Sequence, residues 1–525
     1  MSRDQAGTDR GKMVKAAGIV GGATVVSRIL GLARDAVMAA IFGATPAADA
    51  FFVAFRIPNL MRQLFGEGAL ASSFVPVYTD ILEKEGRSKA ADFASNLFSL
   101  VVLVLVILTG LGVLFAPWLV RMVALGFSPG SEVFNLAVLL IRWMLPYMVF
   151  ICAAAMYMGI LNSHRHFLAP AAAPVLLNIS IITAALFVAP SLEVPITALA
   201  WAVLAGGVLQ LLVQLPPLKK RDVVPRLGIP RLSPEVRRMA VIMGPAVLGV
   251  AVYQVNVLVD TLLASFLPTG SITYLWYGNR MMQFPLGVFG IALATAALPT
   301  LSSQVAEGRD EDFRGTVSFA LGLTAFIGIP AAVGLIALRD PIMATLFGHG
   351  AFVLADVKGA AQALLYYSIG LPLFIGIKII GRAFYALENT RIPFLAAGAA
   401  LVVNVVLNLL LMGPMAHAGL ALATSLASGV NLIVLARFFT RESGVGWFNK
   451  DLKREIFFSS LAAGLMFLAT SALAAKVNWM GLSTLYRVAG LVGCVGLGIG
   501  VYSVAAWIFG CKGMKTLINK MSGKR

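Results

Sequence analysis

The stretch Leu97-Phe-Ser-Leu-Val-Val-Leu-Val-Leu-Val-Ile-Leu-Thr-Gly-Leu-Gly-Val-Leu-Phe-Ala116 contains no charged residue. An α-helix needs roughly 20 mostly apolar residues to cross the hydrocarbon core of a bilayer, so this stretch predicts a membrane-spanning helix. Similar windows recur along the whole chain, with only short polar breaks between them. We expect about fourteen such helices, at residues 13–43, 47–82, 91–125, 132–161, 167–190, 194–217, 234–266, 272–303, 313–346, 354–387, 391–412, 417–440, 453–475 and 483–510. The predicted fold is therefore an all-α polytopic membrane protein.

The composition of the chain agrees with this prediction. Of the 525 residues, 59% are hydrophobic and only 12% are charged, which is more apolar surface than a soluble fold can bury. The net charge of +17 comes from Lys and Arg residues that gather in alternate loops, above all around 219–238, whereas the loops near 43–47 and 413–417 contain none. By the positive-inside rule, both termini are cytoplasmic and the protein lies in the inner membrane. The basic loops are explained by topology, so no nucleic-acid partner is expected.

Short motifs recur in the two halves of the chain at a spacing of about 223 residues. The segment 69–76 resembles 292–299, and 157–163 resembles 384–390. Each half then holds six helices in the same orientation, which predicts two parallel lobes that keep a substrate between them and alternate access. Two further helices follow the repeat. We place the N-terminal lobe at 1–225, the C-terminal lobe at 226–445, and helices thirteen and fourteen with a basic cytoplasmic tail at 446–525.

Polar residues inside the apolar windows carry the predicted chemistry. An Arg at the bilayer centre costs about 2.5 to 3.5 kcal/mol, so intramembrane arginines are expected to face a wet cavity or one another. Arg280 falls at the position equivalent to Arg56 in the second half of the repeat. The polar residues of the first two windows are Arg28, Arg34, Asp35, Asp49, Arg56, Asn59, Arg62 and Glu67.

Among these residues, arginines outnumber the acids beside them. The guanidinium fork matches phosphate oxygens bidentately, so the excess positive charge predicts an anionic, phosphate-bearing substrate. The alternative is a set of buried ion pairs that lock the lobes, such as Arg28 with Asp35 or Arg62 with Glu67.

A second polar set lies in the C-terminal windows and consists of Asp260, Asn404, Asn408 and Thr424. An intramembrane Asp needs a partner. Oxygen ligands from three helices suit a small hard cation such as Na⁺, which would act as a coupling ion. The alternative is an interhelical cluster of hydrogen bonds in which Asp260 is protonated. No other cofactor is expected.

The segments Ser27-Arg-Ile-Leu-Gly-Leu-Ala-Arg-Asp35 and Ala48-Asp-Ala-Phe-Phe-Val-Ala-Phe-Arg-Ile-Pro-Asn-Leu-Met-Arg62 resemble the MurJ (MviN) family of lipid II flippases. The resemblance implies the multidrug/oligosaccharidyl-lipid/polysaccharide exporter fold and transfer of undecaprenyl-diphosphate-linked peptidoglycan precursor to the periplasmic leaflet. It implies a polyprenyl groove on helices thirteen and fourteen, and cell-wall synthesis proteins and membrane lipids as candidate partners. It implies as diphosphate-binding residues Arg28, Arg34, Arg62 and Arg280, with Asp35 and Asp49 as polar partners. The neutral Asn279 and Gln283 depart from acidic residues in some relatives.

The competing function classes are a drug or cation exporter or another polyprenyl-linked glycan exporter of the same fold, and a membrane enzyme. A cation exporter would favour carboxylates in its cavity, which contrasts with the arginines found here. An enzyme would need an acid/base or metal constellation, and the four histidines lie scattered at loop edges. We therefore expect a transporter.

Overall fold

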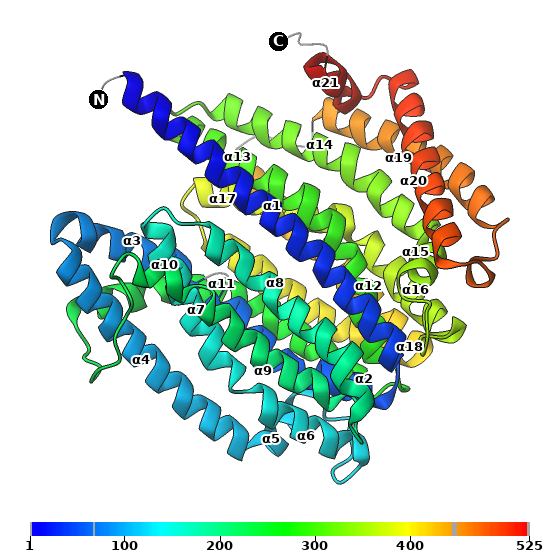
Figure 1. Ribbon diagram of the computed structural model, residues 1–525. Coiled ribbons are helices and arrows are strands. Elements are labelled where there is room, and N and C mark those ends of the chain that lie inside the picture. Colours follow the sequence, from blue (N-terminus) through cyan, green and yellow to red (C-terminus); the bar gives the residue numbers. More distant parts are fainter. Residues whose placement is uncertain (1–2, 67–68, 444–448, 522–525) are drawn as a thin grey trace. The chain divides into compact units, whose positions relative to one another are not determined.

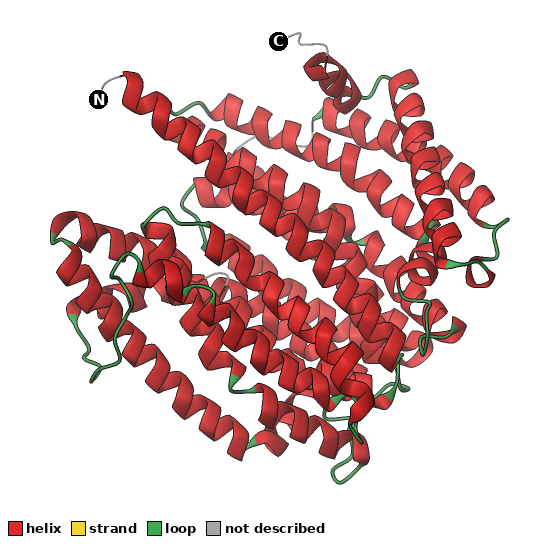
Figure 2. Cartoon of the chain, in the orientation of Figure 1, coloured by secondary structure: helices red, strands yellow, loops and turns green. Residues whose placement is uncertain are grey.

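The computed structural model describes residues 3–66, 69–443 and 449–521. These residues form helices joined by short loops, and no strand occurs among them (Figure 2). The chain divides into two compact units, residues 1–262 and residues 263–525. Helices of both units are labelled in Figure 1.

The first unit contains most of the helices before residue 263. The long helix α1 (Arg3–Phe42) begins it, and α11 (Pro234–Ala264) crosses its boundary. Between them lie α2 (Pro46–Met61), the π-helical turn η1 (Arg62–Gly66), α3 (Ala69–Lys84), α4 (Arg87–Leu114), α5 (Ala116–Val123), α6 (Glu132–Met144), α7 (Tyr147–Ser163), α8 (Leu168–Thr183), η2 (Ala184–Val188), η3 (Ala189–Ser191), α9 (Thr197–Leu212) and α10 (Leu215–Lys219).

The second unit repeats much of this order and then adds three helices at its end. The added helices are α19 (Lys450–Ala474), α20 (Thr484–Ile508) and α21 (Lys512–Met521), with the short turn η5 (Trp479–Gly481) between the first two. They follow α12 (Ser271–Pro285), the π-helical turn η4 (Leu286–Gly290), α13 (Ile291–Ala306), α14 (Asp310–Ala337), α15 (Arg339–Leu346), α16 (Leu354–Ile369), α17 (Leu371–Ala386) and α18 (Arg391–Ser443).

The predicted repeat is visible in the element boundaries. Helices α4 and α14 have the same length, and each is followed by a single break residue and an eight-residue helix, α5 or α15. All four of these boundaries are spaced by 223 residues, and the π-helical turns η1 and η4 are spaced by 224. Arg56 and Arg280 both lie six residues before the π-helical turn that follows them. This confirms that the two arginines occupy equivalent positions.

One motif pairing needs correction. The segments 157–163 and 384–390 were matched at a spacing of 227, but the structure pairs Leu161 with Phe384, at the repeat spacing of 223. After α7, Arg165 has φ 56° and the next amide donates to the Leu161 carbonyl; after α17, Glu388 has φ 55° and the next amide donates to the Phe384 carbonyl. Both ends are left-handed C-caps of the same kind. The motif match slipped by four residues because positions four apart share one helix face and look alike in apolar sequence.

Every predicted apolar window coincides with a helical stretch. Within the described ranges, nine helices are long and apolar enough to span a membrane, and ten if the pair α16 and α17, bent by 41°, counts as one span. Two predicted windows lie in α18, whose helical path is interrupted at Ala416, where φ is 48°. The number of fourteen spans and the parallel arrangement of the lobes stay predictions.

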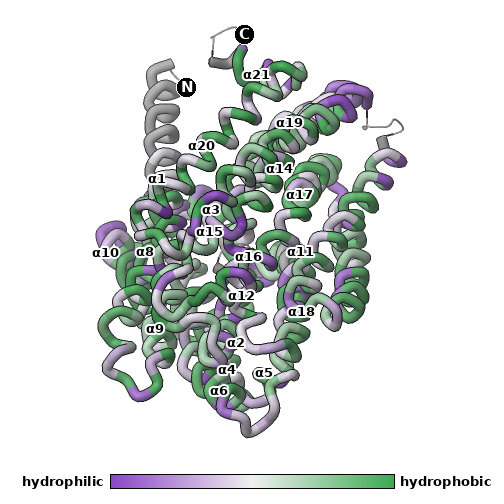
Figure 3. The backbone as a smooth tube through the Cα atoms, turned by 90° about the vertical axis from the view of Figure 1, so that its right-hand side faces the viewer, coloured by the Kyte–Doolittle hydropathy of each residue, from purple (hydrophilic) through white to green (hydrophobic). Residues whose placement is uncertain are grey.

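Each unit has apolar contacts of its own. In the first unit, Phe74 stacks on Tyr78 and Phe93 with ring centroids 5.2 and 5.9 Å apart, and all three side chains are buried. In the second unit, α19 packs on α14 and α20, and the Tyr502 hydroxyl donates to the Phe326 carbonyl at 2.6 Å. Figure 3 shows that hydrophobic residues cover much of the length of the helices, while strongly hydrophilic residues gather at many helix ends. Outward-facing apolar side chains on spanning helices are the surface that lipid covers.

Candidate functional site

Helix α1 carries a buried ion pair. The Arg34 guanidinium contacts the Asp35 carboxylate through Nη2 at 2.6 Å and through Nε at 3.0 Å, and both side chains are buried. Arg34 also donates from Nη1 to Asn178 of α8 at 3.3 Å, and Asn178 donates to the Ser27 carbonyl at 3.1 Å. Asp35 therefore pairs with its chain neighbour, and the alternative pairing with Arg28 is wrong. Arg28 is half-buried and has no hydrogen bond or ion pair to another residue that the structure describes.

The end of α2 carries a second arginine site. Arg62 opens the π-helical turn η1 and donates to the Asn59 side-chain oxygen from Nε at 3.2 Å and from Nη2 at 2.9 Å. This contact between residues three apart was predicted from helix geometry. π-helical turns inside helices occur frequently at functional sites. Glu67, the alternative partner of Arg62, lies outside the described residues.

The two remaining polar residues of α2 have different surroundings. Asp49 lies in the first turn and is buried, a position where the helix dipole favours negative charge. Arg56 donates from Nε to the Thr261 hydroxyl of α11 at 2.9 Å. Of the predicted arginine set, Arg28, Arg34, Arg56 and Arg62 thus belong to the first unit.

Arg280 belongs to the second unit and is half-buried on α12. Its chain neighbour Asn279 accepts a hydrogen bond from Gln283 one turn later. The residues that depart from the family pattern therefore form a neutral amide pair beside the arginine.

The break in α18 brings a polar cluster together in the second unit. Asn408 donates to the Asn404 oxygen at 2.9 Å, and Asn404 donates to the Thr424 hydroxyl at 3.2 Å. Asn404 and Asn408 are completely buried. Three of the four predicted cation ligands are therefore neighbours. The fourth, Asp260, belongs to the first unit, where Asn256 donates to its Oδ2 at 3.4 Å.

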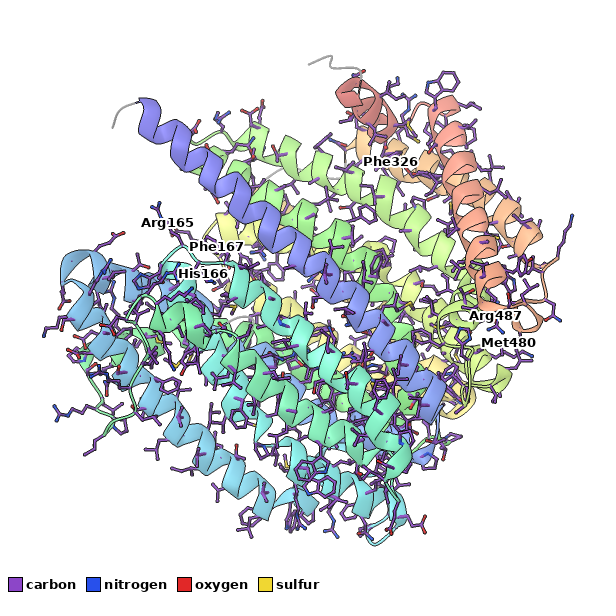
Figure 4. All side chains as sticks on the ribbon, viewed as in Figure 1. Arg165, His166, Phe167, Phe326, Met480 and Arg487 are labelled. Atoms are coloured by element: carbon purple, nitrogen blue, oxygen red, sulfur yellow. The ribbon has the colours of Figure 1, made fainter. Side chains whose placement is uncertain are left out.

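Two buried charges on the added helices were missed by the sequence reasoning, although each is a charge inside an apolar window. Arg487 of α20 donates only to backbone carbonyls, those of Ala344 and Gly348 at 3.0 and 2.7 Å and those of Met480 and Leu482 at 2.9 Å (Figure 4). It fastens the start of α20 to the end of α15, where helix carbonyls lack partners.

Glu455 of α19 has the complementary role at another helix end. Its two oxygens accept from the amides of Lys512 and Gly513 at 2.7 and 2.9 Å, at the N-terminus of α21. The negative charge matches the positive end of that helix dipole. Both buried charges therefore have structural partners within the second unit.

Comparison with known proteins identifies the family. The sequence profile described as "Lipid II flippase MurJ" matches residues 38–492. The lipid II flippase MurJ of Burkholderia cenocepacia is 37% identical over 506 residues, covering 94% of this chain and 96% of that protein. The probable lipid II flippase MurJ of Vibrio cholerae is 36% identical over 513 residues, covering 95% of this chain and 97% of that protein.

Solved structures agree. A structure described as "Lipid II flippase MurJ, inward closed conformation" matches with a TM-score of 0.78 and 27% identity, over 93% of this chain and 98% of that one. An inward-facing multidrug transporter of the MATE family matches with a TM-score of 0.70 at 16% identity, over 80% of this chain and 94% of that one, which shows a shared fold only. The family is one of transporters, not enzymes. This chain belongs to the lipid II flippase MurJ family.

Proposed function

We propose that this chain transfers lipid II from the cytoplasmic to the periplasmic leaflet of the inner membrane, where it supplies peptidoglycan synthesis. The observation that carries the proposal is the family match over nearly the whole chain, in a multi-pass protein whose apolar helices hold Arg28, Arg34 and Arg62. The orientation with both termini in the cytoplasm follows from the charge distribution of the loops.

The proposed ligands of the diphosphate are Arg28, Arg34, Arg62 and Arg280. A charge-assisted hydrogen bond to a phosphate oxygen contributes about 1.5 to 3 kcal/mol, more than a neutral one. Arg62 suits this role because Asn59 holds its guanidinium through a neutral oxygen and leaves its positive charge uncompensated. Arg34 shares its charge with Asp35 and is expected to contribute less.

Alternating access is the proposed mechanism. The chain would expose these arginines first to one side of the membrane and then to the other, with the diphosphate bound during the change. The polyprenyl tail would stay in lipid beside α19 and α20, which are apolar spans added after the repeat.

Na⁺ is the proposed coupling ion. Amide and hydroxyl oxygens are ligands of hard cations, and Asn404, Asn408 and Thr424 offer them from one cluster in the second unit. Asp260 stays the carboxylate ligand predicted from the sequence.

Complementation tests the function. Cells depleted of their own lipid II flippase should grow when this chain is supplied. Alanine at Arg28, Arg34, Arg62 or Arg280 should abolish that growth at normal expression, and lysine should restore it poorly because an ammonium lacks the guanidinium fork. Failure of the inserted wild-type chain to support growth overturns the function, and full growth with all four alanine variants overturns the proposed diphosphate ligands.

A further inference from the structure

The segment 223–233, here called the strap, joins α10 to α11 without forming helix or strand (Figure 1). Both of its ends are fixed in the apolar core of the first unit, through Val223 and through Val236 at the start of α11. The strap between these anchors is therefore held close to the helices that form that core.

The backbone of the strap is bound by polar side chains of α4. The Arg226 amide donates to the Ser95 hydroxyl at 3.1 Å, and the Gly228 amide donates to the Ser99 hydroxyl at 2.9 Å. The Asn96 side chain accepts from the Arg231 amide at 2.6 Å and donates to the Arg231 carbonyl at 2.8 Å. Irregular backbone can lie at membrane depth only where protein satisfies its polar groups. Helix α4 supplies these partners.

The opposite face of the strap is apolar. Leu227, Ile229 and Leu232 are 70%, 89% and 85% exposed, and no other large apolar side chain in the described chain is more exposed than Ile229. Burying one such side chain is worth about 1.5 to 3 kcal/mol, so a water-filled setting would leave a large unfavourable surface. Directly beyond Ser99, α4 itself turns apolar side chains outward from Leu103 onward. The exposed face of the strap thus lies at one end of a helix surface that lipid covers.

The charges around this face are positive. Arg226, Arg231 and Arg237 are exposed, while Arg238 pairs with Asp80 at 2.9 Å. An open hollow of about 620 Å³ lies beside them, lined by Leu232, Arg237, Val241 and neighbouring residues of α11. Apolar side chains flanked by arginines match a phospholipid, whose acyl chains are apolar and whose phosphate is anionic.

We infer that the strap is a binding site for anionic phospholipid. Leu227, Ile229 and Leu232 enter the boundary between headgroups and acyl chains, and Arg226, Arg231 and Arg237 contact the lipid phosphate. The bonds to α4 let the strap lie in this layer without unpaired backbone groups. This inference is independent of which substrate the protein transports.

Depth measurements test the apolar half of the site. The three native cysteines are buried, so the unmodified chain serves as the labelling blank. A nitroxide on Ile229→Cys, in liposomes that contain phosphatidylglycerol, should collide more with oxygen than with a water-soluble nickel chelate. Arg309→Cys, in the exposed loop between α13 and α14, should show the reverse preference. If Ile229→Cys behaves like Arg309→Cys, the face meets water or a soluble protein, and the inference is wrong.

Lipid titration tests the basic half. In a neutral detergent, phosphatidylglycerol should raise the thermal unfolding midpoint of the wild-type chain more than phosphatidylcholine does. The triple variant Arg226→Gln, Arg231→Gln, Arg237→Gln should lose most of that difference. The control triple variant Arg437→Gln, Arg441→Gln, Lys453→Gln removes the same charge from other exposed sites and should keep it. An undiminished difference in the strap variant, or an equal loss in both, overturns the site.

Discussion

The stretch α2–η1–α3 of the first repeat and the stretch α12–η4–α13 of the second have the same order, and each has a five-residue π-helical turn at its centre. Their chemistry differs at that turn. The first turn opens with Arg62, and the second opens with Leu286 at the equivalent position. Arg56 and Arg280 are the charge that both share. The duplicated backbone therefore sets positions, while individual side chains set what each half can bind.

The next pair of equivalent helices shows the same division. In the first repeat, Asn178 of α8 holds Arg34. In the second repeat, the polar residues of α18 are Asn404 and Asn408, and their equivalents on α8, at the repeat spacing, are the buried Ile181 and Ala185. Charge recognition is thus concentrated in the first repeat, and neutral oxygen ligands are concentrated in the second.

Making the first turn resemble the second gives the largest expected effect. Arg62→Leu copies Leu286, and we expect complete loss of growth support at normal membrane expression. The fold should survive, because Arg62 is half-buried and loses only its bonds to Asn59. Leu286→Met provides the control, with growth retained. Normal growth of the Arg62→Leu variant would show that the difference between the two turns has no role in transport.

The buried ion pair of α1 sharpens the comparison in stability. Asp35→Asn leaves Arg34 buried with only neutral partners, and breaking a buried pair in this way costs about 3 to 5 kcal/mol. Lys84→Gln removes an exposed pair with Asp80 and should cost less than about 1 kcal/mol. Thermal unfolding in detergent measures both. Equal, small losses would mean that the α1 pair is as well hydrated as a surface pair.

The helices were predictable because uninterrupted apolar runs leave few alternatives in a bilayer. The equivalence of Arg56 and Arg280 was predictable for a related reason, since the repeat spacing is long compared with the few residues of error in a helix boundary. Arg62 and Asn59 were predicted to contact each other, because helix geometry alone places residues three apart together.

The missed features depend on tertiary contacts. Nothing in the sequence of α1 shows that Asp35 binds Arg34, because Asn178, which fixes the guanidinium, lies on another helix. Arg487 and Glu455 bind backbone groups, which leave no pattern of side-chain types in the sequence. The same reason hides the strap, whose partners on α4 are small polar residues of an otherwise apolar window.

The polar cluster of the second repeat gives a prediction about ion dependence. Asp260→Asn keeps the shape of the side chain but removes the charge that offsets dehydration of a cation, so transport should lose its response to Na⁺. Asn408→Ala should weaken the response less, because a neutral oxygen contributes less than a carboxylate. Substrate accessibility in proteoliposomes with and without Na⁺ measures this. An absent Na⁺ response in the wild type would leave a proton or the membrane potential as the driving force.

The smallest expected effect concerns the loop after α7, where the first repeat has His164 and His166 and the second has Leu387 and Asn389 at the same spacing (Figure 4). Burial lowers the pKa of both histidines, and neighbouring positive charge, including that of Arg221, lowers it further. The unfolded chain therefore binds more protons than the folded chain once the pH falls below the ordinary histidine value of 6.5.

The stability that these histidines contribute should consequently be constant above that value and should decline as the pH falls through it, until the folded histidines are themselves protonated. His164 also shares a hydrogen bond of 3.1 Å with the Tyr78 hydroxyl, which a second ring proton would restrict to donation from the ring. In the double variant His164→Gln, His166→Gln, the unfolding midpoint should fall less between pH 7 and pH 5 than in the wild type. Asn389→Gln, in the equivalent loop of the second repeat, should keep the wild-type slope. An unchanged slope in the double variant would assign the acid sensitivity to other groups and would remove this difference between the two repeats.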